Sequence, residues 1–501
     1  MDAVDILGYV EEPAKKVPIL YDVDVAVAGS GTASTIAAVA AGRYGASTVL
    51  IDRFGQPGGN IGPGMWCGGS LHLALASGAD PDDDALINRS GMGGIPEEFH
   101  RRIIHSRPKA DQISEEVEKE LEEKHLNVAG YRAGTGGPGL PGYFVDAQVC
   151  SHVALEMLEE AGVELLLSAY AGDPIVEDGA VKGLFAETKS GRVAIRAKVV
   201  IDGTGQAELA MRAGAPVKKN RSPNLGLWYT LGGVDWERYQ KFVENHQEAS
   251  EEDLDWSRRH LAASETEADP FPNMRHMLPH LRRAWEAGEF EFRRKIGRGS
   301  IHISLKNIGH NMAGGRTGTA GEFDFSEAKI VSLMEREHRE QCYKFARFLH
   351  RHIPGFEDSF LMLCSPFLGA RGGRYIDAEY PISNDDLHAE RRFDDVVYIY
   401  DDGRVHKNCD VPYRALIPKE IDGLIATGRS AMPYGPNFRV RCNMFLNGQA
   451  AGVAAALCAR NGVQPRHLDV KELQKILVHE LHCPLAEEER LAQLGLLEER
   501  R

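Results

Sequence analysis

The amino-acid sequence predicts an α/β protein in which helices flank a parallel sheet. Two observations predict this class. The stretch VDVAVAGSGTASTIAAVAAGRYGASTVLIDR, residues 23–53, has in turn the patterns of a strand, a glycine turn, a helix and a strand. Two more strand patterns end in glycine turns much later, within 195–216 and 423–430. We therefore expect distant segments to meet in one sheet.

The first strand and helix enclose the turn GSGTAS, which begins at Gly29. Gly29 permits a tight turn, Gly31 lets a pyrophosphate approach the backbone, and the small Ser34 allows close packing of helix on strand. The N–H groups at the helix N-terminus attract phosphate. Asp52 ends the second strand at the spacing of a residue that binds a ribose hydroxyl. This unit predicts a dinucleotide site and by itself leaves NAD and FAD open.

The elements that follow extend the pattern. The segment GQPGGNIGPGMWCGG, residues 55–69, predicts a backbone that lies close to a flat or charged group. Three strands with turns at 177–179 and 189–191 are predicted before the strand KVVID and the turn Gly203-Thr204-Gly205. After the third turn, GLIATGRS, a helix with a small-residue face is predicted from Asn443 to about Arg460.

Composition limits the classes of partner. The chain has 501 residues and a formal net charge of −15, which disfavours nucleic acid and anionic membranes. Its eight cysteines form no Cys-x-x-Cys pair, and no stretch has the length and apolarity of a membrane span or signal peptide. We therefore expect a cytoplasmic protein with a small-molecule substrate, and a homo-oligomer is compatible with the sequence.

These motifs together resemble the FAD-dependent oxidoreductases of the glutathione-reductase-like superfamily, in particular the group with a C-terminal GQAAG signature, which stands here at 448–452. The resemblance implies a discontinuous Rossmann-like FAD-binding domain with an inserted α+β substrate domain. It also implies a division into 18–220, the first part of the FAD-binding domain; 221–412, the substrate domain; 413–465, the last FAD-binding part; and 466–501, a C-terminal helical segment. The sequence departs from the group at Arg441-Cys442, where apolar and proline-like residues are expected.

The resemblance implies a set of FAD-binding residues. Gly448 and Gln449 would open the last helix, with its positive end toward the flavin pyrimidine ring. The whole set comprises Gly29, Gly31, Thr32, Ala33, Ser34, Asp52, Arg53, Gly58, Gly59, Asn60, Asp202, Gly203, Gly205, Gly428, Arg429, Asn443, Gly448 and Gln449.

The substrate side offers weaker candidates. A strand beginning at Asn224 and another beginning at Ser300 alternate apolar and polar residues, which is typical of a sheet over a flavin and of any half-exposed sheet. Several arginines suggest an anionic or oxygen-rich substrate, with salt bridges to Asp377, Glu379 and Asp410 as the alternative. The predicted catalytic residues are His302, His310, Tyr434, Arg371 and Arg439, and the related arginines are Arg374 and Arg441.

We therefore expect hydride transfer between a small polar or anionic organic substrate and flavin N5, with a positioned residue such as His302 or Tyr434 handling the proton. Oxidation of a C–H bond beside oxygen or nitrogen and reduction of an activated double bond are both open, and the electron acceptor is unknown. The alternatives are an NAD-dependent dehydrogenase and a flavoprotein with structural, non-redox FAD. No metal is predicted, because HELHC at 479–483 lacks the spacing H-E-x-x-H.

Overall fold

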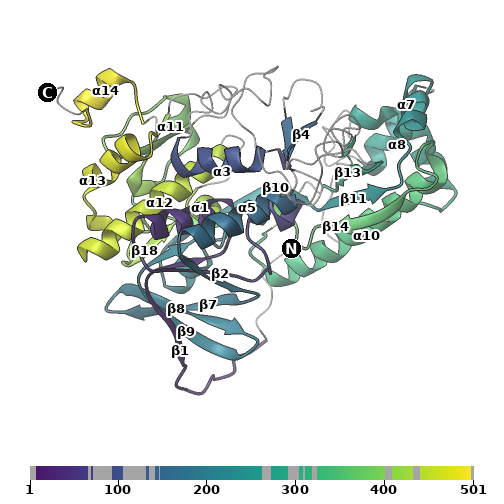
Figure 1. Ribbon diagram of the computed structural model, residues 1–501. Coiled ribbons are helices and arrows are strands. Elements are labelled where there is room, and N and C mark those ends of the chain that lie inside the picture. The colour runs from purple at the N-terminus through teal and green to yellow at the C-terminus, as the bar shows by residue number, and fades with distance from the viewer. Residues whose placement is uncertain are drawn as a thin grey trace, which may run out of the picture.

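The computed structural model describes the chain with gaps, and it has two hydrophobic clusters. Buried side chains of 25–215 and 376–496 form the first cluster, and those of 227–370 form the second. In Figure 1 the second cluster extends to one side of the first. The described residues are 7–65, 69–70, 93–104, 131–134, 142–145, 147–246, 248–261, 272–291, 304–307, 311–318, 324–400, 409–432, 441–483 and 485–497.

The first cluster is built on a seven-stranded sheet in the order β6-β2-β1-β9-β8-β7, with β18 also paired to β9. β1 lies parallel to β2 and β9, and β18 lies parallel to β9, so their carboxyl ends share one edge. The strands are β1 (Ile19–Ala28), β2 (Thr48–Asp52), β6 (Val163–Leu167), β7 (Tyr170–Glu177), β8 (Ala180–Thr188), β9 (Gly191–Asp202) and β18 (Leu424–Ala426).

Helices rich in small residues cover this sheet. Figure 1 shows α1 (Thr32–Arg43), α5 (Ala147–Glu160) and α12 (Arg441–Asn461) gathered on one face of it. α1 and α12 pack directly against each other. A Cβ at Gly452 would lie 2.1 Å from the carbonyl oxygen of Ala37, so this close contact requires glycine. The small-residue stripes in both helices are thus packing surfaces.

Three sequence predictions about elements need correction. The stretch predicted as three strands plus KVVID is divided differently: the first predicted strand forms both β6 and β7, and the third predicted strand and KVVID are one continuous strand, β9. The strand expected from Asn224 is divided between β10 (Val217–Gly226) and β11 (Trp228–Gly232), which pair with different sheets. The last helix begins at Arg441, so Gly448 and Gln449 lie inside it and do not open it.

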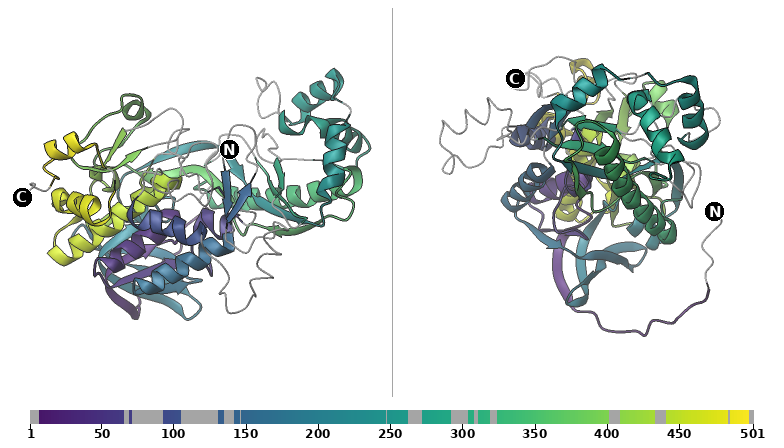
Figure 2. Two further views of the ribbon diagram at one scale, coloured as in Figure 1. Left: turned by 45° about the horizontal axis from the view of Figure 1, so that its top comes forward. Right: turned by 90° about the vertical axis from the view of Figure 1, so that its right-hand side faces the viewer.

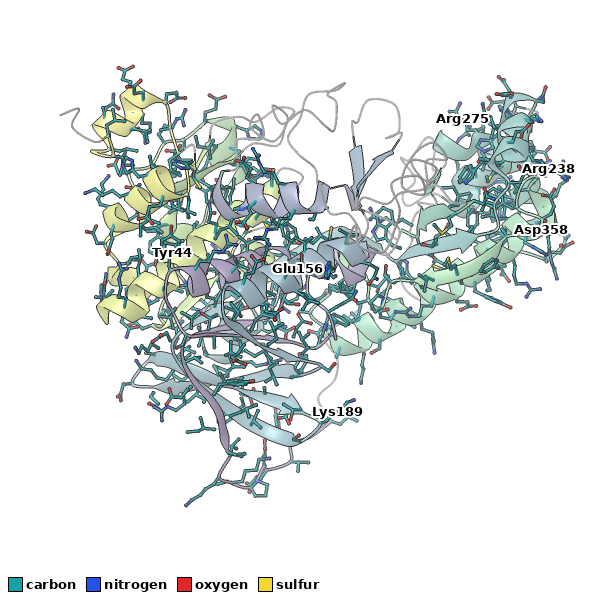
Figure 3. The ribbon with its side chains drawn as sticks, viewed as in Figure 1. Tyr44, Glu156, Lys189, Arg238, Arg275 and Asp358 are labelled. Carbon is teal, nitrogen blue, oxygen red and sulfur yellow. The ribbon has the colours of Figure 1, made fainter. Side chains whose placement is uncertain are left out.

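The second cluster combines a four-stranded antiparallel sheet, in the order β12-β13-β11-β14, with the 25-residue helix α10. Figure 2 shows this unit from two further sides. Arg238 and Asp358 lie at its outer end in Figure 3. Its elements are β12 (Ser304–Asn307), β13 (Ala313–Arg316), β14 (Phe360–Cys364), α7 (Trp236–Glu244), α8 (Glu251–Leu261), α9 (Leu278–Glu286) and α10 (Ala328–His352).

Two strands link the clusters. β10 pairs antiparallel with β15 (Gly369–Ile376), so that Val217 faces Ile376 in the first cluster while Leu225 faces Ala370 in the second. Residues 376–411, predicted within the substrate domain, contribute side chains such as Val396 and Tyr398 to the first cluster. The division into domains remains an expectation for the rest of the chain.

Several of the remaining elements contribute side chains to the first cluster. Tyr44, labelled in Figure 3, ends α1 and donates a hydrogen bond from its hydroxyl to Glu480, 3.1 Å away. In the described ranges no helix is long and apolar enough to cross a membrane. The other elements are β3 (Gly69–Ser70), α3 (Gly94–Ile104), β4 (Tyr131–Gly134), β5 (Gly142–Val145), α6 (Glu208–Arg212), α11 (Asn384–His388), β16 (Val396–Tyr400), β17 (Cys409–Pro412), α13 (Val470–Lys475) and α14 (Glu488–Gln493).

Candidate functional site

The three predicted glycine turns meet at the carboxyl edge of the parallel sheet. Ala28 ends β1 and pairs with Ile51, the last residue but one of β2, and with Asp202, which ends β9. Ala426 pairs with Asp202 from β18. The N–H of Gly203 donates to Ala28 O at 3.0 Å, and that of Thr427 donates to Asp202 O at 2.9 Å. The sheet register therefore brings the turns after β1, β9 and β18 together, as the sequence predicted.

The turns touch so closely that only glycine fits between them. Gly29 has φ +91°, and a Cβ there would lie 2.6 Å from Gly203 O. A Cβ at Gly203 would lie 1.9 Å from Ser34 Oγ, and one at Gly428 would lie 2.9 Å from Ala33 Cβ. Ser34 and Ala33 are accordingly buried contacts of the second and third turns.

Gly31 differs from these glycines, because a Cβ built on it meets no protein atom within 4 Å. It is the N-cap residue of α1, with φ −63°, and no side chain caps the helix. Thr32 begins the helix, so the first-turn N–H groups face the opening above Gly31 without a capping side chain. A helix N-terminus of this kind binds phosphate groups.

Asp52 organises the first turn. It is 9% exposed, and its Oδ2 accepts hydrogen bonds from the N–H and hydroxyl of Ser30 at 2.5 and 2.7 Å. Its Oδ1 accepts from the N–H of Phe54 at 2.7 Å. The guanidinium of Arg53 lies 4.8 Å from the ring centroid of Phe54, in cation–π contact.

The second glycine loop folds back on the first turn. Gly58 N donates to Ser30 O at 2.8 Å, and a Cβ at Gly59 would lie 2.8 Å from the Cα of Gly31. Gly58 and Gly59 both have positive φ, so the loop needs glycine at each position. Asn60 follows them and is exposed.

Two residues that sequence reasoning missed hold the turns in place. Ser430 Oγ accepts from the N–H groups of Gly205 and Ala207 at 2.9 and 3.0 Å and donates to Asp202 at 3.1 Å. Asn447 Oδ1 accepts from the Thr427 hydroxyl and the Gly428 N–H, both at 2.7 Å. Each stands one position beside a predicted residue, Ser430 after Arg429 and Asn447 before Gly448.

Asp202 itself is fully buried, and both of its carboxylate oxygens accept hydrogen bonds from other protein groups. Its Oδ1 accepts from the N–H and hydroxyl of Thr204, and its Oδ2 accepts from Ala210 N at 3.0 Å. Asp202 therefore shapes the second turn and caps the short helix after it.

Arg429, predicted beside the cofactor, joins two parts of the protein. Its Nε donates to Gly205 O at 2.7 Å, and its Nη1 donates to Ala370 O on β15. Gln206 makes a parallel link, because its Nε2 donates to Gly372 O at 3.2 Å and its Oε1 accepts from Arg374 N at 2.9 Å. Gln206 was not predicted, since nothing in its sequence neighbourhood indicates a contact with β15.

The predicted residues of the last helix have mainly structural partners. Gly448 packs on α1, since a Cβ there would lie 2.1 Å from Ala33 O. Gln449 is 1% exposed; its Oε1 accepts from Ile95 N at 2.8 Å and its Nε2 contacts Cys483 Sγ at 2.8 Å. Asn443 is also buried, in the first turn of the helix.

Most of the predicted catalytic residues lie outside the described residues, namely His302, His310, Tyr434 and Arg439. Arg371 lies on β15, opposite Asn224 of β10. Arg374, three residues further along the strand, has a buried Nε without a hydrogen-bond partner.

The alternative of salt bridges to Asp377, Glu379 and Asp410 is wrong for Arg374. Asp377 pairs with Lys218 at 2.8 Å, Glu379 with Arg466, and Asp410 with Arg392 at 2.9 Å. Within the described part of the chain, no carboxylate pairs with Arg374.

A buried histidine that sequence reasoning also missed lies on α3. His100 is 0% exposed, its Nδ1 contacts Pro96 O at 2.6 Å, and its ring packs edge-on against Phe445 of α12. Burial lowers the pKa of His100 to about 4, so its ring is neutral near neutral pH. Of the described residues, no group of histidine, cysteine and carboxylate side chains is arranged to hold a metal ion.

Comparison with known families identifies the class of protein. Residues 24–477 match the family described as FAD dependent oxidoreductase, and the chain therefore belongs to that family. FAD is the cofactor of this family, which confirms the predicted cofactor; the alternative of an NAD-dependent dehydrogenase is wrong.

The curated relatives match only part of this chain, at low sequence identity. The chain is 26% identical over 214 residues to digeranylgeranylglycerophospholipid reductase 2 of Methanothermobacter thermautotrophicus, with 42% of this chain and 47% of the relative covered. It is 28% identical over 184 residues to digeranylgeranylglycerophospholipid reductase 1 of Methanopyrus kandleri, with 36% and 39% covered. The chain thus spans less than half the length of the curated relatives it matches.

Solved structures that align with this chain over most of its length have low sequence identity to it. A geranylgeranyl bacteriochlorophyll reductase-like protein from Thermoplasma acidophilum is 14% identical, with a TM-score of 0.42 and coverage of 95% of this chain and 89% of that one. OxyS anhydrotetracycline hydroxylase from Streptomyces rimosus is 10% identical, with a TM-score of 0.44 and coverage of 95% and 73%.

The described residues fit FAD. The turns around Gly29, Gly203 and Gly428 surround the uncapped start of α1, and the space above Gly31 is open to a ligand. Phosphate groups suit the first-turn N–H groups of α1, and Asp52 with Ser30 suits a ribose hydroxyl beside them.

Proposed function

We propose that this FAD-dependent oxidoreductase transfers a hydride between a small polar or anionic organic substrate and N5 of FAD. The observation that carries the proposal is the meeting of three glycine turns around the uncapped N-terminus of α1, in a chain of this family. FAD supplies, when bound, a ring that accepts or donates the hydride.

The residues of the chain divide the remaining tasks. The first turn of α1 and the glycines around it bind the pyrophosphate, and Asp52 binds the adenosine ribose. Arg371 and Arg374 on β15 bind the anionic group of the substrate. A residue among His302, His310, Tyr434 and Arg439 handles the proton or orients the substrate.

The position of the positively charged Arg374 supports the anionic character of the substrate. The three turns at Gly29, Gly203 and Gly428 together form what we call the cradle, which we propose binds FAD. Gln206 and Arg429 tie β15 to the second of these turns, so Arg374 lies on a strand fixed beside the cradle. The polar or anionic group would bind there while the reacting carbon lies over the flavin at roughly 3–3.5 Å.

The direction of the reaction decides which compounds to test. The curated relatives are named as reductases, which supports including activated double bonds beside hydroxy acids, sugars and amines. The first experiment records the visible absorption spectrum of the purified protein before and after anaerobic addition of each compound. Photoreduced protein, treated with unsaturated acids, tests the reverse direction.

The possible outcomes distinguish hydride transfer, a structural FAD and a chain that does not bind FAD. Bleaching of the flavin spectrum by one compound, or reoxidation by one unsaturated acid, would support hydride transfer and identify the substrate class. A flavin spectrum that no compound changes in either direction would favour a structural FAD. No flavin spectrum after reconstitution with FAD would contradict the proposed cradle.

A variant tests the role of Arg374. We expect Arg374→Leu to raise KM for an anionic substrate about tenfold or more, which corresponds to at least about 1.4 kcal/mol, with little effect on a neutral analogue. Arg238→Leu, at the outer end of the second cluster (Figure 3), is the matched control. Equal effects of Arg374→Leu on charged and neutral substrates would contradict this role.

A further inference from the structure

One face of α10 runs antiparallel to the segment that leaves β14. Glu335, Arg339 and residue 342 are spaced i, i+4, i+7, so they share a helix face. Glu335 Oε1 accepts from Leu368 N at 2.8 Å, and Arg339 Nη2 donates to Pro366 O at 3.0 Å. The third position on this face, Cys342, follows the same register and meets Cys364 at the end of β14.

The two thiols are in direct contact but differ in exposure. Cys342 is 0% exposed within the second cluster, whereas Cys364 is partly exposed. Their side chains are hydrogen-bonded to each other, and Arg339 lies close enough to act on both. Helix and strand are held in this register by the hydrogen bonds of Glu335 and Arg339, which do not involve sulfur.

We propose that Cys342 and Cys364 form a redox-active dithiol, which hydrogen peroxide converts to a disulfide that ties α10 to β14. The site lies in the second cluster and is separate from the glycine turns that bind FAD. Its chemistry is independent of the proposed hydride transfer.

The reaction proceeds in two balanced steps. The thiolate of Cys364 attacks one oxygen of hydrogen peroxide, the O–O bond breaks, and Cys364 becomes a sulfenic acid while the other oxygen leaves as water after protonation. The sulfur of Cys342 then attacks the sulfenic sulfur, the S–O bond breaks, and the Cys342 proton leaves with the hydroxide as a second water. Two thiols and one peroxide thus give one disulfide and two waters.

The surroundings assign the two roles. The hydrogen bond from Cys342 and the positive charge of Arg339 lower the pKa of Cys364 against the effect of its burial. Burial first, and then the hydrogen bond to Cys364, raise the pKa of Cys342 well above its ordinary value. The partly exposed Cys364 is therefore the attacking thiolate, and the buried Cys342 resolves its sulfenic acid.

Other described cysteines have partners of a different kind. Cys409 Sγ donates to Asp386 O at 3.3 Å, and Cys483 contacts the Gln449 amide. Cys458 is hydrogen-bonded to the hydroxyl of Tyr413. We therefore expect peroxide to consume the Cys342–Cys364 pair selectively.

The test uses the full chain, reduced with dithiothreitol, desalted and treated with a small excess of hydrogen peroxide. We expect the thiols counted after denaturation to fall from eight to six and to return to eight with dithiothreitol. Peptide mass spectrometry without reduction should find one cross-linked peptide pair, 342 to 364, that lacks two hydrogens.

Variants separate the two roles. Cys364→Ser should keep all its remaining thiols, because Cys342 is buried. Cys342→Ala should stop at a sulfenic acid on Cys364 that dimedone traps. Arg339→Gln should slow disulfide formation several-fold at neutral pH and shift the pH profile of its rate upward, an effect that loss of packing alone would not produce.

The control is Cys458→Ala, which should still lose two thiols. Circular dichroism and thermal melting confirm that each variant is folded before its thiols are counted. Three results would overturn the proposal: no loss of thiols in the folded wild-type protein, a cross-link between other cysteines or between two chains, or oxidation of Cys364 to sulfinic acid while Cys342 stays reduced.

Discussion

At the residue scale, glycine occupies the positions of the cradle for two different physical reasons. Gly29, Gly203 and Gly428 are needed because neighbouring backbone or side chains leave no room for a Cβ. Gly31 has room and an ordinary φ of −63°, so the folded protein alone does not require it. The pyrophosphate that we propose binds above the helix N-terminus would account for the absence of a side chain at Gly31.

We therefore expect Gly31→Ala to weaken FAD binding about tenfold or more while the apoprotein keeps its melting temperature to within a few degrees. Isothermal titration with FAD and thermal melting of the apoprotein measure the two effects. Gly8→Ala, also without neighbours within 4 Å, is the control. Unchanged FAD affinity in Gly31→Ala would place the pyrophosphate elsewhere.

His100 gives a second prediction at this scale. Its pKa is lowered by burial to about 4 in the folded protein, against an ordinary 6.5. Between these values the unfolded chain binds a proton that the folded chain does not, so stability falls as pH falls from 6.5 toward 4. The full difference corresponds to about 3 kcal/mol.

Urea unfolding at pH 7 and pH 4.5 measures this contribution to the free energy of unfolding. His100→Leu should lose less stability over that interval than the wild type. The exposed His152, replaced by Gln, should leave the wild-type dependence unchanged. A wild-type slope in His100→Leu would show that other groups account for the acid sensitivity.

At the element scale, the site depends on hydrogen bonds that hold its turns together. Ser430 accepts two N–H groups of the turn after β9, and Asn447 of α12 accepts two donors from the turn after β18. Buried backbone donors require such acceptors. The cradle is therefore one hydrogen-bonded structure made of three separate segments.

Ser430→Ala should lower the free energy of unfolding by about 1–3 kcal/mol, because Gly205 N and Ala207 N lose their shared acceptor. It should also weaken FAD binding, since the second turn loses its support. Chemical denaturation and FAD titration measure both effects. Ser190→Ala, in an exposed turn, should change neither, and a stable Ser430→Ala protein with full affinity would rule out this support.

At the scale of the whole molecule, two hydrophobic clusters meet at β10 and β15. Gln206 and Arg429 connect the second glycine turn to β15, and Ser365 Oγ donates to Gly64 O at 3.0 Å across the same boundary. The cofactor cradle lies in the first cluster, and Trp236, Trp256 and Trp285 lie in the second. In a Trp66→Phe background, which removes the tryptophan of the glycine loop 55–69, the tryptophan signal therefore reports on the second cluster and the flavin signal on the proposed cradle in the first.

Gln206→Ala should separate these two signals in a urea titration. Removal of the side chain leaves Gly372 O and Arg374 N without partners, which costs about 1–3 kcal/mol and weakens the link between clusters. We expect coincident transitions in the holoprotein and in Gln240→Ala, an exposed control, and distinct transitions in Gln206→Ala. Distinct transitions in the wild type would show that the link is not needed for cooperativity.

The resemblance of all the motifs together to a known family indicated FAD as the cofactor. The sequence by itself determined the strand–turn–helix units and their glycines. These features are local, because strand alternation, turn glycines and helix caps act over a few neighbouring residues. Asp52 and the turns beginning at Gly29, Gly203 and Gly428 could therefore be predicted, as could a last helix within two residues of its observed start.

Only the tertiary structure decided which polar groups hold these units together. Ser430, Asn447 and Gln206 act on segments up to 228 residues away, such as Asp202 for Ser430, at distances in sequence where no periodicity connects them. It likewise showed that Gly448 and Gln449 are packing residues inside α12 and that Cys342 meets Cys364. Such pairings depend on sheet register and helix packing, which the whole chain sets together.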